Sequence, residues 1–164
     1  MLAIAAVIGR EFRLDVLQAV AQVSEEDLVA ALEEAQQRAV IEEWGTSIGS
    51  LSFRFTHALF RQTLYEELFV ARRMRWHQQV ARTLELTYAR RPREHAAELA
   101  EHFAHSTDAA DLAKAVAYGE MAADQAMGVY ASGQAEHLLR QALLAQEVLD
   151  PDDITRRCDL LLKL

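Results

Sequence analysis

The segment Leu51–Leu68 changes its hydrophobic period part-way along, and this change constrains the fold more than any other feature of the chain. Apolar residues first alternate with polar ones, the period of a half-buried strand, at Leu51, Phe53 and Phe55. They then recur every four residues, the spacing of one helical face, at Phe60, Leu64 and Leu68. We therefore expect a strand over residues 51–55 that turns directly into a helix, with Thr56 as the N-cap.

His57 stands at this expected junction, on the first turn of a helix over residues 57–68. Backbone N–H groups without helical partners and the positive end of the helix dipole both favour an anion at such a position. The geometry suits contact with a phosphate, and the alternative is that His57 only caps the helix or packs against the sheet. Arg61 lies one turn further on, where it either shares the phosphate or pairs with Glu66 or solvent, and we favour the second interpretation, a surface residue.

Length and composition limit the chain to one ordinary domain or two small ones. It has 164 residues, 51% of them hydrophobic, so it can build a sizeable core and disorder is not expected. Only two prolines and six glycines interrupt the sequence, which favours long helices. The formal net charge of −8 argues against a general affinity for nucleic acid or anionic membranes.

Two features predict a cytoplasmic protein. Cys158 is the single cysteine, so no internal disulfide forms and a reducing compartment fits, with the thiol expected to be buried in a terminal helix. The apolar opening LAIAAVI is too short to span a bilayer and lacks the basic flank of a signal peptide. It predicts a buried core helix whose upstream sequence is missing. At the other end, LLLKL stops without a helix cap, so both ends are expected to be cut from a longer protein.

The first part of the chain, residues 1–92, has the element order of a winged-helix domain. Helices are expected at 2–8, 14–22 and 24–38, with a turn at 9–12 and Ser24 as the third N-cap. A strand at 40–44, a hairpin loop at 45–50 and the strand at 51–55 form the predicted wing. Helices at 57–68 and 71–88 follow, until Arg91 and Pro92 break the chain. The second helix is expected to bury Val70, Met74 and His77, or Val80 and Leu84 further on.

The second part, residues 93–164, is predicted to be entirely helical, with helices at 93–105, 111–131, 133–149 and 152–164. Small and large residues have the spacing of tetratricopeptide packing positions at Ala123, Ala126, Ala135, Leu139 and Ala142. The expected fold is therefore mainly α: a winged-helix domain with a small β-hairpin at 1–92, then the start of a tetratricopeptide-like helical array at 93–164. A single helical hairpin packed through alanines is the alternative for the second part.

Three segments together resemble one family: AAVIGREFRLDVL at 5–17, FRFTHALFRQTLYEEL at 53–68 and AELAEHFAHSTDAADLAKAVAYGEMAADQA at 97–126. Nearly the whole chain is similar to the region that follows the P-loop ATPase module in bacterial STAND-class signalling regulators of the AAA, LuxR-linked and cyclase-linked types. Such regulators carry the ATPase module, then a winged helix, then a helical-repeat sensor. The motif F-x-H-A-L-x-R-x-x-L-Y carries the most specific part of the resemblance.

The resemblance implies a role for His57 and for a module that this sequence does not contain. In such regulators a winged-helix histidine contacts the β-phosphate of bound ADP and holds the resting state, and His57 resembles it by its place at a strand-to-helix junction. Ala58 departs from the related eukaryotic motif, which has an aspartate there. No G-x-x-x-x-G-K-[ST] loop occurs in these residues, so this chain is expected to be non-catalytic, to hold no cofactor itself, and to depend on a parent protein that binds ATP or ADP.

The function implied is regulatory coupling between that ATPase module and an effector, a protein or a small molecule, bound by the helical repeats. Transcriptional regulation and signal transduction are the outputs of such regulators. The first rival function is a free-standing helical scaffold for protein–protein interaction. The second rival function is a DNA-binding winged-helix transcription factor. Neither rival function requires a nucleotide, whereas regulatory coupling to the ATPase module does.

Direct DNA binding is disfavoured by the charge of the third helix, the element that such a domain places in the major groove. Arg38 is its one basic residue, against the acidic residues Glu25, Glu26, Asp27, Glu33 and Glu34. The basic segment Arg72 to Arg75 does not favour DNA binding either. On a helix its arginines would be spread around the polar side and would not line up along a phosphate backbone.

Four residues with metal-binding side chains recur at helical spacing: His95, Glu98, His102 and His105. Three or four such ligands converging on one point would suit zinc. The same spacing also describes a polar helix face beside the core residues Leu99 and Phe103, and this interpretation is the one we favour. No metal is therefore expected.

Overall fold

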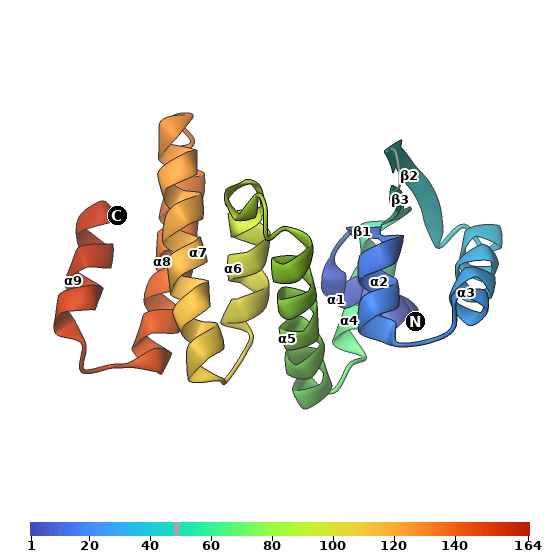
Figure 1. Cartoon of the computed structure of the whole chain (residues 1–164), viewed down its shortest axis with the longest axis horizontal. Coiled ribbons are helices and arrows are strands. Elements are labelled where there is room, and N and C mark those ends of the chain that lie inside the picture. Colours follow the sequence, from blue (N-terminus) through green and yellow to red (C-terminus); the bar gives the residue numbers. More distant parts are fainter. Residues whose placement is uncertain (48–49) are drawn as a thin grey trace. The chain divides into compact units, whose positions relative to one another are not determined.

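The computed structural model describes residues 1–47 and 50–164. Within these ranges the chain is mainly helical, with nine α-helices, one 3₁₀ helix and a small three-stranded antiparallel sheet (Figure 1). It divides into two compact units, unit 1 (Met1–Thr83) and unit 2 (Leu84–Leu164). The division falls inside a helix, upstream of the Pro92 break that suggested a boundary in the sequence. The prediction of a mainly α fold with a small sheet is confirmed.

Unit 1 holds the sheet and the first five helices, the last of which continues into unit 2. The helices are α1 (Leu2–Ile8), α2 (Leu14–Ala21), α3 (Glu25–Gln37), α4 (Ala58–Glu66) and α5 (Val70–Thr87). The strands are β1 (Glu11–Arg13), β2 (Ile41–Ser47) and β3 (Ser50–Phe55). Of the predicted hairpin loop at 45–50, residues 45–47 belong to β2 and Ser50 is the first residue of β3, whereas residues 48–49 lie outside the described residues.

The sheet has the order β1-β3-β2, with both pairs antiparallel. Its first strand replaces the turn that the sequence predicted at 9–12, so that prediction is wrong. Phe12 lies opposite Phe53, and the two rings stack with their centroids 5.9 Å apart. The ring of Phe12 also lies 5.6 Å from that of Phe55. A three-residue strand has little intrinsic preference of its own, so pairing with β3 and burial of Phe12 stabilise it.

The N-cap of α3 is the residue that the sequence predicted. The Ser24 hydroxyl oxygen accepts the Asp27 backbone N–H at 3.1 Å and so satisfies one of the free donors of the first turn. Leu28, Leu32 and Ala35 recur along one face of the helix and are buried. This spacing anchors α3 by its apolar stripe and leaves its other residues toward solvent.

Helices α4 and α5 are joined by a polar contact. The hydroxyl of Tyr65 and Nε2 of His77 lie 3.0 Å apart, and the two rings meet edge to face. His77 is buried, as its helical spacing predicted, and so are Val80 and Ala81 on the same helix. Val70 is exposed, however, which makes its predicted burial wrong: it is the first residue of α5, before the helix reaches its packing partners.

Unit 2 is a succession of helices, each packed on the next: α6 (Ala96–Ala104), α7 (Ala109–Gly128), α8 (Ser132–Leu149) and α9 (Ile154–Lys163). A 3₁₀ turn, Pro92–His95, precedes them. The five residues predicted as packing positions are all buried: Ala123, Ala126, Ala135, Leu139 and Ala142. A Cβ added to Gly119 of α7 would lie 3.1 Å from the Ala142 Cβ, so α7 and α8 approach more closely than a larger side chain allows.

Polar pairs tie this unit together beside its small-residue core. The end of α5 that belongs to unit 2 carries Glu85, whose carboxylate accepts from Lys114 Nζ at 2.6 Å and from the Tyr118 hydroxyl at 3.0 Å. Burial, then the hydrogen bond and charge of Glu85, raise the pKa of Tyr118 to about 12. In the loop before α7, the buried Ser106 hydroxyl donates to Asp111 at 2.9 Å. No helix in the described ranges is long and apolar enough to cross a membrane.

Candidate functional site

The junction between β3 and α4 differs in one detail from the sequence prediction. The Thr56 hydroxyl donates to the carbonyl oxygens of Ala39 and Val40, at 2.6 and 3.2 Å, and therefore faces the start of β2. Thr56 is not the N-cap, which corrects the prediction. The cap is His57, whose extended backbone precedes the first helical residue of α4. The tertiary contact with the α3–β2 connection outweighs the local preference of threonine for capping.

The imidazole of His57 takes part in the cap. Its Nδ1 accepts the Leu59 backbone N–H at 3.4 Å, and its ring lies edge-on to Phe60, with centroids 6.5 Å apart. A neutral ring that accepts at Nδ1 carries its proton on Nε2, so it keeps one N–H donor for another group. His57 is exposed. The arrangement lets an anion meet this donor at the positive end of the helix dipole.

Arg61 is tethered inside unit 1 and is not a surface residue paired with Glu66 or solvent, as the sequence suggested. Its Nε donates to the Ala6 carbonyl oxygen at 3.0 Å, in the last turn of α1. Its guanidinium carbon also lies 5.7 Å from the centre of the Tyr65 ring. A cation at the C-terminal end of a helix is favoured by the helix dipole. This contact fixes α4 against α1 and thereby orients the His57 end of α4.

The face around His57 is open and apolar. Leu59 is 61% exposed and Phe60 is 42% exposed, although both are large hydrophobic residues. Within α4, all of whose residues the structure describes, none is buried. The face of α4 predicted from Phe60, Leu64 and Leu68 is thus partly open in unit 1. Exposed large apolar side chains that flank a polar group are typical of a surface that meets another protein.

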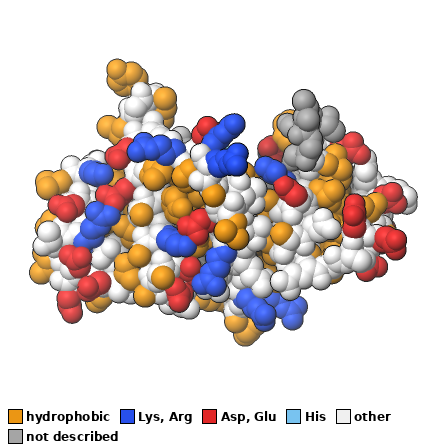
Figure 2. Space-filling view, in the orientation of Figure 1, with side chains coloured by type: hydrophobic (Ala, Val, Ile, Leu, Met, Phe, Trp, Pro, Cys, Tyr) orange, Lys and Arg blue, Asp and Glu red, His pale blue; other side chains and the backbone are white. Residues whose placement is uncertain are grey.

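The surface of α3 is strongly acidic. Figure 2 shows carboxylate side chains gathered over this helix, and its five acidic residues are exposed: Glu25, Glu26, Asp27, Glu33 and Glu34. Arg38, which caps the helix at its C-terminal end, pairs with Glu34 at 2.7 Å. On β3, Arg54 is held by an ion pair with Glu42 and lies over the Trp44 ring at 3.4 Å. The acidic surface of α3 therefore repels phosphate groups, and the charge of Arg54 is already compensated by Glu42.

The spacing of the histidines near Pro92 is kept in part: His95 Nδ1 lies 3.5 Å from the Glu98 carboxylate, one turn further on. His95 lies in the 3₁₀ turn before α6, where its ring stacks on Tyr88 with centroids 3.4 Å apart. His102 is buried, and His105 follows the end of α6. Among the described residues, no group of three or more histidine, cysteine or carboxylate side chains is placed to hold a metal ion.

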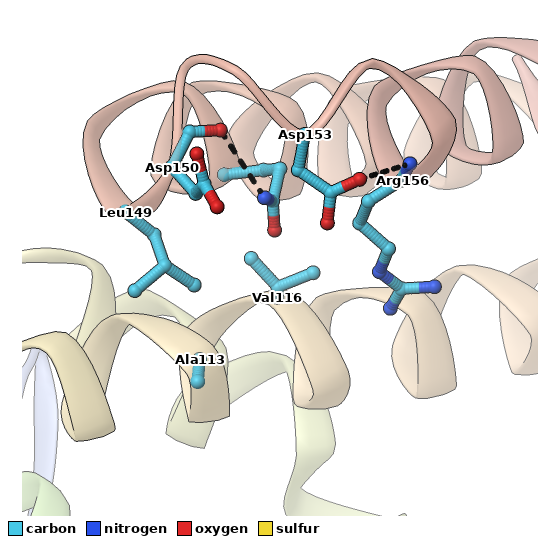
Figure 3. Close-up of a pocket in the computed structure, with 7 residues that line it drawn as sticks. Ala113, Val116, Leu149, Asp150, Asp153 and Arg156 are labelled. Carbon is cyan, nitrogen blue, oxygen red and sulfur yellow. Dashed lines mark hydrogen bonds between the residues drawn. The ribbon is translucent and has the colours of Figure 1, made fainter.

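Unit 2 contains a groove that the sequence did not reveal. It has a volume of about 390 Å³ and lies between α7 and the turn that joins α8 to α9 (Figure 3). The residues that line it are Ala113, Val116, Gln146, Leu149, Asp150, Asp153 and Arg156. The one sequence signal near it is the break at Asp150-Pro151-Asp152, and this signal marked a turn without indicating that α7 lies opposite.

One side of the groove is bordered by an ion-pair network between α7 and α9. Glu120 pairs with Arg156, and Lys163 lies 3.3 Å from the Glu120 carboxylate and 3.5 Å from that of Asp124. Burial lowers the pKa of Lys163, but the hydrogen bonds and charges of Glu120 and Asp124 outweigh it, and the pKa is raised overall. Cys158, on the same helix, is exposed, so its predicted burial is wrong.

Comparison of this sequence and structure with protein-family models, with curated proteins and with solved structures found no match. Any assignment of function therefore depends on the geometry of the His57 junction and of the groove in unit 2.

Proposed function

We propose that this chain is a non-catalytic regulatory fragment of a nucleotide-switched signalling or transcriptional regulator. Unit 1 would be a winged-helix domain that rests on an ATPase module, and unit 2 the start of a tetratricopeptide-like array that binds an effector. The observation that carries the proposal is the His57 junction. There, an exposed imidazole with an available N–H donor lies at a helix N-terminus between the exposed side chains of Leu59 and Phe60.

The order of elements in unit 1 supports the winged-helix assignment. From the N-terminus it runs helix, strand, helix, helix, strand, strand, and β3 lies between β1 and β2 in the sheet. A winged helix uses its last two strands as the wing, which here leads directly into His57 and α4. In unit 2, the buried small residues at the α7–α8 contact, Gly119 and Ala142 among them, support a repeat array.

The switch would operate through the phosphate contact of His57. With ADP bound to the ATPase module, the Nε2–H donor of His57 would contact the β-phosphate while Leu59 and Phe60 pack against that module. Exchange for ATP would remove this contact, and the population would shift toward an open form. An effector bound to unit 2 could act on the same equilibrium to the extent that it binds one form more tightly.

The two rival functions make different use of the same surfaces. A winged-helix transcription factor would press α3 into DNA, and the five exposed carboxylates of α3 disfavour this. A free-standing scaffold would use the groove and the helix faces of unit 2 but would give His57 no phosphate to contact. The test of the proposal is therefore a test of His57.

The experiment measures ADP that co-purifies with the natural full-length protein, for the wild type and three variants. His57→Asn keeps an N-cap side chain but removes the imidazole N–H donor, whereas His57→Ala removes both. His137→Ala is the matched control, because His137 is an exposed histidine on α8. We expect loss of most ADP from both His57 variants and none from the control. Retention of ADP by both His57 variants, or a full-length protein without any P-loop, would remove the switch and leave the scaffold as the better account.

A further inference from the structure

The corner at which α4 ends and α5 begins carries large apolar side chains in solvent. Phe69 is 77% exposed and Val70, its neighbour, is 55% exposed. The backbone that carries them is nevertheless fixed, because the Phe69 carbonyl oxygen accepts the N–H groups of Arg72 and Arg73, at 2.9 and 3.1 Å, and so begins α5. Adjacent apolar side chains held in solvent by an ordered backbone are typical of a surface that meets another protein.

Charges of opposite sign flank these two apolar side chains. On one side, Glu66 ends α4 and Glu67 caps it, and both are exposed. On the other side, the first turns of α5 carry the exposed residues Arg72 and Arg75. Figure 2 shows basic side chains beside an apolar one at the lower edge of the view, where α5 begins in Figure 1. We call residues 66–75 the α4–α5 corner: an apolar centre with an acidic side and a basic side.

Neither side of the α4–α5 corner is neutralised within the chain. Glu66 accepts the side-chain amide of Gln62 at 2.8 Å, and Arg72 lies over an aromatic ring of its own helix at 5.8 Å. Among the residues that the structure describes, Glu66, Glu67, Arg72 and Arg75 form no ion pair. Both signs of charge are therefore available to a partner.

The same charges also stand at unfavourable ends of their helices. The helix dipole favours acidic side chains in a first turn and basic side chains in a last turn. At the α4–α5 corner the order is reversed: α4 ends on two acids with no basic residue in its last turn, and α5 begins with arginines and has no acid in its first turn. A local preference broken on both sides, with no compensating contact in the chain, is typical of a functional surface.

The charge pattern selects among possible partners. A partner that relieves both sides must bring basic groups to the end of α4 and acidic groups to the start of α5. A nucleic acid or an anionic membrane brings only negative charge and would repel Glu66 and Glu67. The acidic surface of α3 on a second copy would complement the arginines alone. The α4–α5 corner of a second copy, turned by a two-fold axis, supplies both signs, because such an interface sets each end of a patch against the other end.

We propose that two copies of this chain associate through their α4–α5 corners about a two-fold axis. Phe69 and Val70 of the two copies meet at the axis, and Glu66 and Glu67 of one copy face the arginines of the other. The patch is small and its charges are exposed, so the dimer is weak and sensitive to salt. This inference goes beyond the proposed function: it requires no nucleotide, and it uses the end of α4 opposite to His57.

The experiment measures the mass of the whole chain by sedimentation equilibrium, from about 10 μM to about 1 mM protein. We expect the average mass to rise with concentration from the 18.5 kDa of a single chain toward twice that value. Raising the salt from about 0.05 M to about 0.5 M should weaken the dimer about tenfold, because screening reduces the attraction between exposed charges.

Two charge variants test the two-fold pairing. The basic variant has Glu66→Lys with Glu67→Lys, and the acidic variant has Arg72→Glu with Arg75→Glu. Each alone should weaken its own dimer about tenfold or more, because like charges then face each other across the axis. A mixture of the two should form a mixed dimer at least as tight as the wild type. Both variants remove an unfavourable charge from a helix end, so each should fold at least as stably as the wild type.

Two further variants separate the α4–α5 corner from other surfaces. Phe69→Ser removes the apolar centre without changing charge, and its exposure means that folding is retained. It should weaken the dimer about tenfold or more. Glu26→Lys with Glu33→Lys makes the same change of charge as the basic variant, at exposed positions of α3, and should leave dimerisation unchanged.

Each result bears on the proposal directly. A rise in mass that both charge variants abolish and their mixture restores supports the two-fold pairing. A single-chain mass at every concentration would overturn it, as would a dimer that survives Phe69→Ser and both charge variants. Loss of the dimer in the α3 variant would overturn it too, because the arginines would then meet α3 of a second copy. Charge variants that stay monomeric when mixed would exclude the pairing of acidic with basic sides.

Discussion

The two units of this chain differ in the residues and contacts that form their hydrophobic cores. In unit 1 the sheet contributes three buried aromatic rings, Phe12, Phe53 and Phe55, which join segments far apart in the sequence, in addition to the buried aliphatic residues of the helices. Unit 2 fills its core largely with alanines, and each helix packs on the one before it in the chain. The first unit therefore depends on a few long-range contacts, and the second on many local ones.

This difference predicts different cooperativity. Losing β1 or β3 from a three-stranded sheet removes the surface on which the neighbouring helices pack, so unit 1 should unfold as a whole. A stack of helices with nearest-neighbour contacts has stability that is roughly a sum over pairs, so a defect in unit 2 should stay near its origin. Substitutions in each unit, and a change of pH, should therefore affect unit 1 globally and unit 2 locally.

Phe55→Ala should have the largest effect. Phe55 has no exposed surface, and truncation of a buried phenylalanine costs about 3–5 kcal/mol through lost burial and the cavity that remains. Hydrogen exchange should show loss of protection throughout the strands and α1–α3, with α7 and α8 still protected. Leu86→Ala, at a residue 79% exposed, is the control and should cost less than about 0.5 kcal/mol. Protection lost in β3 but kept in β1 would contradict a cooperative unit 1.

Gly119→Leu should be the strongest disruption of unit 2. A Cβ at this position already lies 3.1 Å from the Ala142 Cβ, so a branched side chain must push α7 and α8 apart, at a cost of about 1–3 kcal/mol. Gly133→Ala is the matched control, because nothing lies within 4 Å of its added Cβ and alanine favours the helix. Urea unfolding with hydrogen exchange should locate the loss in the α7–α8 pair. Equal loss of protection across α6–α9 would show that unit 2 unfolds as a whole and not helix pair by helix pair.

High pH should weaken unit 2 through Tyr118. Its pKa is raised from 10.0 to about 12 in the folded chain, so the stability linked to its proton is complete below pH 10 and is lost as the pH rises toward 12. The loss should be on the order of 1 kcal/mol after screening by solvent. Urea unfolding between pH 8 and pH 11.5 should give a flatter profile for Tyr118→Phe, and no change for Tyr130→Phe, at a tyrosine that is 95% exposed. Parallel profiles for Tyr118→Phe and wild type would exclude this linkage.

Removing matched N-caps should give the smallest effect and the finest comparison of the units. Ser24 caps α3 in unit 1, and Asp108 caps α7 in unit 2 by accepting the N–H groups of Ala110 and Asp111. Ser24→Ala and Asp108→Ala should each cost about 1 kcal/mol. Hydrogen exchange should accelerate over all of unit 1 in the first variant and mainly over the start of α7 in the second. If faster hydrogen exchange extended over the whole unit in both variants, the two units would not differ in cooperativity.

Much of the helical structure was predictable, because it depends on residues close in sequence. The Ser24 cap, the breaks near Pro92 and Pro151, and the alanine spacing of α7 and α8 each have a local physical cause. The predicted helices consequently agree with the observed ones to within a few residues at most ends. Cap geometry and the final turns account for those differences.

Three of the errors involve partners distant in the sequence. β1 forms because Phe12 packs on Phe53 and Phe55, which a three-residue segment cannot signal. Thr56 loses the capping role to His57 because its hydroxyl bonds the connection between α3 and β2. Arg61 reaches the Ala6 carbonyl oxygen, fifty-five positions away in the sequence. Each contact depends on where another element lies, and local propensity carries no such information.

The candidate sites divide in the same way. Hydrophobic period and composition alone predict that His57 stands where a strand becomes a helix and that α3 is acidic, since both are local properties of the chain. The capping role of His57, the exposure of Leu59 and Phe60 beside it, and the groove between α7 and the α8–α9 turn all depend on how the elements pack. A groove is made by side chains of different elements, so it exists only once those elements have packed.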